Sequence, residues 1–133
     1  MFKLHEEGLS KPQRITGYIL ALLPALGVMG SGFTKFFPNT EIHALLDQLG
    51  MGDYAVLIGL IEILVVALYL IPKTSNIGFF LFCSYIGAII VGELVIGDVP
   101  LPGLTIGVMI YVGTLLLRPS LLGWDGSRSR RDA

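Results

Sequence analysis

Glu62 is the residue whose type and position point most directly to chemistry. It lies in the middle of an apolar run that reads Gly-Leu-Ile-Glu-Ile-Leu over residues 59–64. A charged side chain at the centre of a bilayer costs about 2.5–3.5 kcal/mol on insertion scales, so such residues usually face the interior of a helix bundle and mark a functional site. Two interpretations therefore stand for Glu62. It is a proton-active or ligand-binding group, or it is a protonated or paired carboxyl that holds two helices together.

Four further polar side chains fall near Glu62 when the chain is threaded across a membrane. Lys35 ends the first apolar run and Glu93 lies about one turn from the end of the third, at similar depth. Lys35 also has a simpler interpretation, because lysines at helix ends commonly extend to the lipid headgroups. Tyr85 falls about 80° from Glu93 around a helix, so the two can line one broad face. We predict a polar pocket in the outer half of the membrane, with Glu62, Lys35, Glu93, Tyr85 and Ser31 as its ligand-binding residues.

The residues that are missing exclude several kinds of site. Cys83 is the single cysteine, so the chain has no Cys-x-x-Cys pair for thiol oxidoreduction. His5 and His43 are the only histidines and neither lies in an apolar run, which excludes a bis-histidine haem within the membrane. No set of His, Cys or carboxylate residues has metal-ligand spacing. We therefore expect no metal and no covalently bound cofactor, and a net charge of −1 gives no indication of nucleic-acid binding.

The composition is typical of a protein embedded in the lipid bilayer. Charged residues make up 14% of the chain, compared with about 25% in soluble domains, and the mean hydropathy is +0.77. A transmembrane helix needs about 20 predominantly apolar residues. Four stretches meet this need, the second and fourth close to the lower limit: residues 15–36, 54–71, 77–96 and 103–117.

The connections between these stretches predict the fold. Residues 72–76 and 97–102 are short and contain Pro and Gly, so neighbouring helices should run antiparallel. We expect Asp53 to cap the second helix, and Thr74, Ser75 or Asn76 to cap the third. The predicted fold class is an all-α membrane protein, an antiparallel four-transmembrane-helix bundle with a short amphipathic helix between helices 1 and 2.

That amphipathic helix is predicted within residues 38–52. Ile42, Leu45, Leu46 and Leu49 recur there at helical spacing. Such a helix either lies on the membrane surface or covers the mouth of the bundle. Within the four long helices, small residues predict close helix–helix packing and self-association into a homo-oligomer. They are Gly27, Gly30, Ser31 and Gly32 in the first, Ser84, Ala88 and Gly92 in the third, and Gly103 and Gly107 in the fourth.

The distribution of Lys and Arg predicts the orientation. Eight basic residues fall on the side of both termini and one, Lys35, on the other, and short cytoplasmic loops carry the excess of positive charge. We expect a multi-pass protein of the plasma (inner) membrane with both termini in the cytoplasm. Residues 1–14 lack the features of a signal peptide, so the first helix should be retained as a signal-anchor. The expected organisation is a cytoplasmic N-terminal segment (1–14), a transmembrane domain (15–118) and a polar cytoplasmic tail (119–133).

Several short motifs follow one another along the chain. The first helix ends in Gly-Phe-Thr-Lys-Phe (32–36), and the second carries residues 59–64 and then Leu-Ile-Pro-Lys-Thr (70–74). The third carries Gly78 and later Gly-Ala (87–88), and the fourth ends in Leu-Leu-Leu-Arg-Pro (115–119). In this order and spacing they resemble the DoxX-like family of small four-helix membrane proteins, over about residues 15–119. Where many relatives have a histidine late in the third helix, this chain has Glu93.

The resemblance implies a membrane subunit of a redox or detoxification system. Some DoxX-like proteins resemble the small membrane subunit of a thiosulfate:quinone oxidoreductase, whereas others look like cargo receptors or assembly chaperones. The leading hypothesis is that the chain binds a small apolar or quinone-like molecule or a lipid in the outer pocket and works with a membrane or redox partner protein. Whether it is itself an enzyme stays open. Two other hypotheses also stay open: a non-enzymatic membrane chaperone or assembly factor, and a small proton-coupled transporter.

Overall fold

The computed structural model describes residues 4–37 and 41–123, and these residues form helices and no strand. Three segments are long and apolar enough to cross a membrane, Lys11–Thr34, Gly52–Leu70 and Ser75–Val95, and a fourth apolar helix is shorter. The all-helical prediction is confirmed. The elements are α1 (Lys11–Thr34), α2 (Glu41–Gln48), the 3-10 turn η1 (Gly52–Tyr54), α3 (Ala55–Leu70), α4 (Ser75–Val95), α5 (Leu101–Leu117) and the 3-10 turn η2 (Pro119–Leu122).

The helix ends differ from the prediction where capping was involved. α1 begins at Lys11 rather than at residue 15, because the Ser10 hydroxyl accepts a hydrogen bond from the Gln13 amide and proline stands in the first turn. The prediction that Asp53 caps α3 is wrong, since Asp53 lies inside η1 and the capping position is Tyr54. Thr74 does hold the capping position of α4, but its hydroxyl donates to the Leu68 carbonyl instead. Residues 38–40 and 124–133, which include part of the predicted amphipathic helix and most of the predicted tail, lie outside the described residues.

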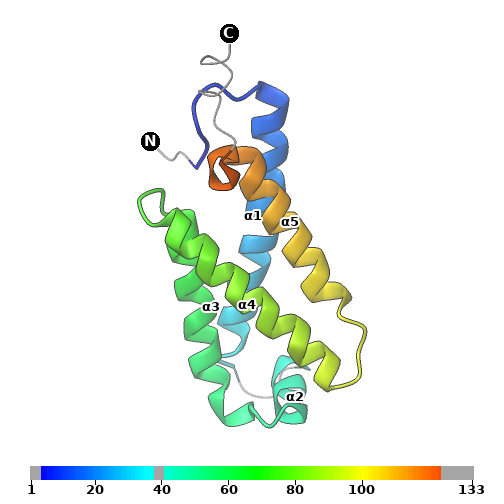
Figure 1. The fold of residues 1–133 in the computed structure, drawn as a ribbon. Helices are drawn as coiled ribbons and strands as arrows, with labels where there is room; N and C mark the ends of the chain where they lie inside the picture. The colour runs from blue at the N-terminus through cyan, green and yellow to red at the C-terminus, as the bar shows by residue number, and fades with distance from the viewer. Residues whose placement is uncertain (1–3, 38–40, 124–133) are drawn as a thin grey trace.

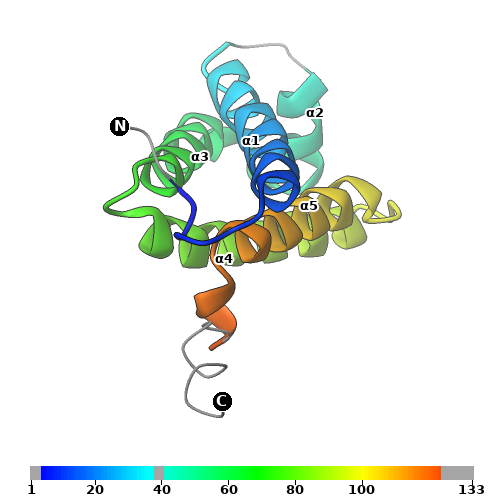
Figure 2. The same cartoon turned by 90° about the horizontal axis from the view of Figure 1, so that it is seen from above.

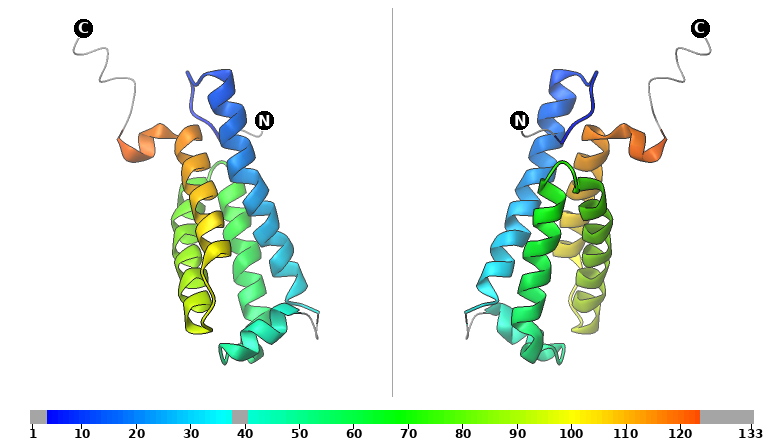
Figure 3. Two further views of the ribbon diagram at one scale, coloured as in Figure 1. Left: turned by 90° about the vertical axis from the view of Figure 1, so that its right-hand side faces the viewer. Right: turned by 90° about the vertical axis from the view of Figure 1, so that its left-hand side faces the viewer.

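Helices α1, α3, α4 and α5 run alternately in opposite directions around one core (Figures 1 and 3). α1 packs against α5 and α3, and α4 packs against α3 and α5, so the four close a ring, as the view in Figure 2 shows. The core is apolar, and its largest fully buried side chains include Tyr69, Phe82, Ile86 and Ile110. α3 and α4 are close at their connecting turn and diverge toward the other end, where α2 lies (Figure 1). We refer to these as the connecting-turn end and the α2 end.

Glycines set where the helices come closest. A Cβ on Gly59 of α3 would lie 2.6 Å from the Gly32 carbonyl oxygen of α1, near the α2 end. A Cβ on Gly78 of α4 would lie 2.2 Å from the Tyr69 backbone nitrogen of α3, near the connecting turn. By contrast, a Cβ on Gly27 or Gly30 would have no atom of the described residues within 4 Å, so the prediction that these two pack against another helix of this chain is wrong. Self-association through them stays a prediction. Near the α2 end, α3 is therefore in close contact with α1, and near the connecting turn it is in close contact with α4. Toward the α2 end, α3 and α4 separate (Figure 1).

A hydrogen bond between Tyr69 of α3 and Thr114 of α5 crosses the core. The two hydroxyl oxygens are 2.7 Å apart and both residues are fully buried. Tyr69→Phe removes one partner and leaves the Thr114 hydroxyl in apolar surroundings, so we expect a loss of about 1 kcal/mol in the free energy of unfolding. Denaturation of the purified protein in detergent measures it. Thr114→Val should cost a similar amount, and the double variant should cost less than the sum, since the second change then removes no further bond.

Candidate functional site

A buried ion pair joins α1 to α3 near the α2 end. The Lys35 ammonium nitrogen Nζ lies 2.8 Å from Glu62 Oε2 and 2.9 Å from Glu62 Oε1, and it also donates to the Ser31 hydroxyl at 2.9 Å. The side chains of Lys35 and Glu62 are only 5% and 3% exposed. Since an ammonium has three N–H groups, these contacts use all of its donors. The interpretation of Lys35 as a lysine that extends to the headgroups is therefore wrong.

The local backbone places this lysine. Lys35 directly follows α1 as its C-terminal cap, and its amide donates to the Gly32 carbonyl, which keeps its side chain one turn from Ser31 on the same face. A Cβ on Gly59 would lie 3.1 Å from the Lys35 Cβ, so the glycine leaves room for the lysine stem to cross to α3. The Lys35 carbonyl oxygen also lies 3.1 Å from His43 Nε2, which links α2 to the end of α1.

A cavity of about 830 Å³ lies beside the ion pair, between the diverging helices and above α2. All five of the side chains that the sequence singled out line it: Ser31, Lys35, Glu62, Tyr85 and Glu93. The rest of its wall is almost entirely apolar. Those other residues come from all five helices and from the segment after α2, and they include Val28, Ile42, Leu45, Leu46, Leu49, Met51, Ile58, Ile61, Ile89, Val91 and Ile106.

The five polar residues do not form one cluster. Ser31, Lys35 and Glu62 are in hydrogen-bond contact, whereas Tyr85 and Glu93 lie on the α4 wall and share no hydrogen bond with them. Glu93 Oε2 accepts a bond from the Gly103 amide at 3.3 Å, in the first turn of α5. A carboxylate there stabilises the helix N-terminus, so Glu93 has a structural role in addition to its place in the wall.

The amphipathic helix covers the bundle mouth. Its predicted apolar residues Ile42, Leu45, Leu46 and Leu49 all line the cavity, and Leu46 is 8% exposed. These residues therefore face the cavity at the α2 end, which agrees with one of the two positions left open by the sequence, and the position on the membrane surface stays a prediction. Val28 is a wall residue that sequence reasoning missed. It was detectable, because it precedes Ser31 and Lys35 at helical spacing on one face of α1.

The chemistry of this site is that of a charged pair in an apolar wall. A carbonyl, ether or phosphate oxygen of a ligand can replace the Ser31 hydroxyl as the acceptor of one Lys35 N–H group, and the Glu62 carboxylate can accept from a hydroxyl or amine. Both interactions are stronger here than in water because the surroundings have a low dielectric constant. Among residues 4–37 and 41–123, no three or more His, Cys, Asp or Glu side chains are grouped so that they could hold a metal ion.

Comparison with known proteins yields no match to a family model, to a curated protein or to a solved structure. The resemblance of the motifs to the DoxX-like family therefore stays a prediction. What the chain does has to be argued from the ion pair, the cavity and the helices that carry them.

Proposed function

We propose that this chain is an integral membrane protein that binds a small amphiphilic molecule in the cavity at the α2 end. The observation that supports this most is a cavity of about 830 Å³ whose apolar wall carries the buried pair Lys35–Glu62. Ligand pockets in proteins typically have about 300–1,000 Å³, a mostly apolar lining and a few placed polar groups. The ligand would have an apolar body against the wall and an oxygen-bearing head at the ion pair.

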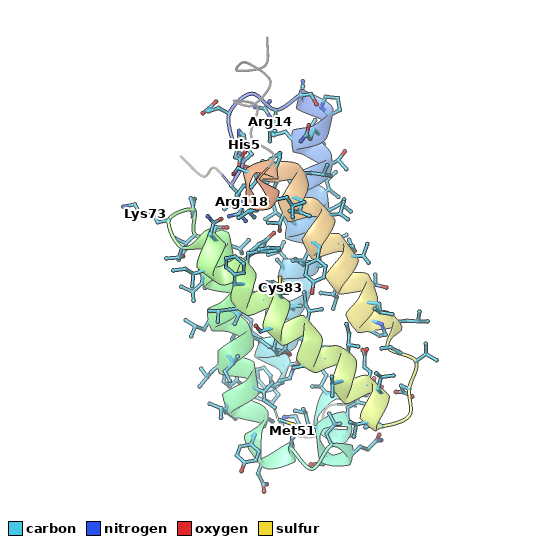
Figure 4. The ribbon with its side chains drawn as sticks, viewed as in Figure 1. His5, Arg14, Met51, Lys73, Cys83 and Arg118 are labelled. Carbon is cyan, nitrogen blue, oxygen red and sulfur yellow. The ribbon has the colours of Figure 1, made fainter. Side chains whose placement is uncertain are left out.

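In this proposal α1, α3, α4 and α5 cross the bilayer as an antiparallel four-helix bundle with both termini in the cytoplasm. α5 has 17 residues, so it is about 25 Å long and must stand steeply in a hydrocarbon core of about 30 Å. Figure 4 supports the orientation, since Arg14, Lys73 and Arg118 all lie at the connecting-turn end. The cavity then opens in the outer half of the membrane.

A quinone-like head group fits the donors and acceptors of the pair. A quinone carbonyl would replace the Ser31 hydroxyl as the acceptor of one Lys35 N–H group, and the hydroxyl of the reduced form would donate to the Glu62 carboxylate. A lipid carbonyl or a hydroxylated apolar compound offers similar atoms. The role that follows is a ligand-binding membrane subunit of a redox or detoxification system, of the DoxX-like kind, that acts with a partner protein.

The core argues against the proton-coupled transporter. Between Glu62 and the Tyr69–Thr114 pair, the interior consists of fully buried apolar side chains such as Val66, Phe82 and Ile86. Proton or solute passage needs a chain of polar groups or water between the two ends. This apolar layer therefore favours a molecule that binds its ligand from one side.

Binding of a short-tailed quinone to the purified full chain tests the proposal. We expect Glu62→Gln to weaken binding about tenfold or more, since it removes a charged partner of the head group and leaves Lys35 without its counter-charge. Native mass spectrometry or titration in detergent measures the affinity. Glu41→Gln is the matched control, because Glu41 is an exposed carboxylate of α2 outside the cavity wall. Equal affinities of the two variants, or no binding to the wild-type chain, would refute a quinone site here.

A further inference from the structure

Arg118, at the other end of the molecule, has an unusual environment. It directly follows α5 and is 9% exposed. Its Nη1 donates to Asn76 Oδ1 at 2.6 Å, whereas its Nε and Nη2 are buried and have no hydrogen-bond partner. A buried guanidinium with unpaired N–H groups is costly, and such charges are normally paired.

No carboxylate in the described part of the chain forms an ion pair with this guanidinium, in contrast to Lys35. Glu6 acts on Arg118 only at longer range. The Glu6 oxygen Oε1 accepts hydrogen bonds from the amide and the hydroxyl of Ser120 instead. The positive charge of Arg118 is therefore buried without a direct counter-charge.

The N-terminus of α4 lies beside the same guanidinium, because Asn76 belongs to the first turn of that helix. No side chain caps this turn: the Thr74 hydroxyl donates to the Leu68 carbonyl, and the Ser75 hydroxyl donates to the Tyr69 carbonyl at 2.6 Å. The first N–H groups of a helix have no partner within the helix, and the helix dipole is positive there. A guanidinium and an uncapped helix N-terminus together favour an anion.

We propose that Arg118 and the N-terminus of α4 form a binding site for a phosphate group. The unpartnered nitrogens Nε and Nη2 are neighbours on one edge of the guanidinium, the edge with which arginine holds two oxygens of one phosphate in parallel. The phosphate belongs either to a phospholipid headgroup or to a free phosphate ion. Arg14 and Lys73 add positive charge at the same end of the molecule (Figure 4).

The N-terminal segment, residues 4–10, controls access to this site. Both nitrogens are shielded from solvent, and the segment is attached to the residue that precedes Arg118 by the bond from the Glu6 amide to the Leu117 carbonyl, at 2.8 Å. The Leu4 amide is attached to the Tyr18 hydroxyl at 2.9 Å. The phosphate group enters by displacing this segment from the end of α5. The site is separate from the cavity at the α2 end and does not depend on what binds there.

Thermal unfolding and native mass spectrometry of the full chain test this proposal with three probes. The probes are phosphatidylglycerol, phosphatidylcholine and inorganic phosphate, the last compared with chloride at equal ionic strength. We expect phosphatidylglycerol or inorganic phosphate to raise the melting temperature of the wild-type protein, and the probe that does so identifies the source of the phosphate. Phosphatidylcholine, whose phosphate is neutralised by choline, should have a smaller effect.

Three variants show whether Arg118 holds the anion. Arg118→Gln should weaken binding of the stabilising probe about tenfold or more. Arg14→Gln removes an equal charge at the same end and should leave most of the wild-type affinity for that probe. Arg118→Lys keeps the charge but loses the bidentate hydrogen bonding of the guanidinium, so we again expect weaker binding of the probe. This variant replaces Arg118→Gln in the test if the glutamine variant does not fold. The proposal is overturned if neither anionic probe stabilises the wild-type protein, or if Arg118→Lys and Arg14→Gln bind the stabilising probe with equal affinity.

Discussion

Glu62→Leu is expected to destabilise the protein by about 3–5 kcal/mol, the loss that follows removal of one partner from a buried ion pair. The remaining Lys35 would be 4% exposed in the wild-type geometry and would keep only the Ser31 hydroxyl as an acceptor. The lysine then either stays charged in an apolar wall or loses its proton, and both cost free energy. The free energy of unfolding, measured by denaturant titration in detergent, gives the loss.

The double variant Lys35→Met/Glu62→Leu separates the ion pair from the packing. It replaces both charges by apolar side chains of similar length, so we expect stability within about 1–2 kcal/mol of the wild type. Strictly additive losses in the two single variants and the double variant would show that the residues are not coupled. The double variant also distinguishes folding from binding, because it should fold and yet bind the short-tailed quinone weakly.

Gly78→Ala is expected to have the largest effect of any change that adds a single methyl group. The new Cβ would lie 2.2 Å from the Tyr69 nitrogen, 2.4 Å from the Tyr69 Cα and 2.5 Å from the Leu68 carbonyl carbon. All three are backbone atoms, so α4 has to move away from α3. That movement disrupts the edge-to-face contact of Tyr69 with Phe82, whose ring centroids are 5.5 Å apart. We expect a loss of about 3 kcal/mol or more, above the usual range for an overpacked core.

Gly87→Ala in the same helix is the matched control. No atom of residues 4–37 and 41–123 lies within 4 Å of a Cβ at that position, so alanine there adds helix propensity, up to about 1 kcal/mol, without a clash. The melting temperatures of Gly78→Ala and Gly87→Ala, measured in the same detergent, test this difference in stability. Similar melting temperatures would mean that α3 and α4 do not meet at Gly78 as described.

The elements were predictable because they depend on short stretches of sequence. Apolar runs, prolines and glycines indicate helices and their connections locally, and α3, α4 and α5 each lie within about two residues of their predicted bounds. Capping was less predictable. Thr74 is a favourable capping residue, but it donates to the carbonyl of Leu68 because the turn between α3 and α4 brings that carbonyl within 2.8 Å.

By itself the sequence determined that the chain forms apolar helices and that Glu62 and Lys35 belong to them, but not that Thr114 and Arg118 are buried. These two residues were identifiable because Glu62 interrupts an apolar run and Lys35 lies at the end of one. Only the tertiary structure decided that they pair, since they lie 27 positions apart and their contact depends on how α1 and α3 are rotated and how closely Gly32 and Gly59 let them approach. The cavity and the environment of Arg118 were likewise decided by the crossing of helices, because a void and an unpaired donor are properties of the assembled bundle and of no single segment.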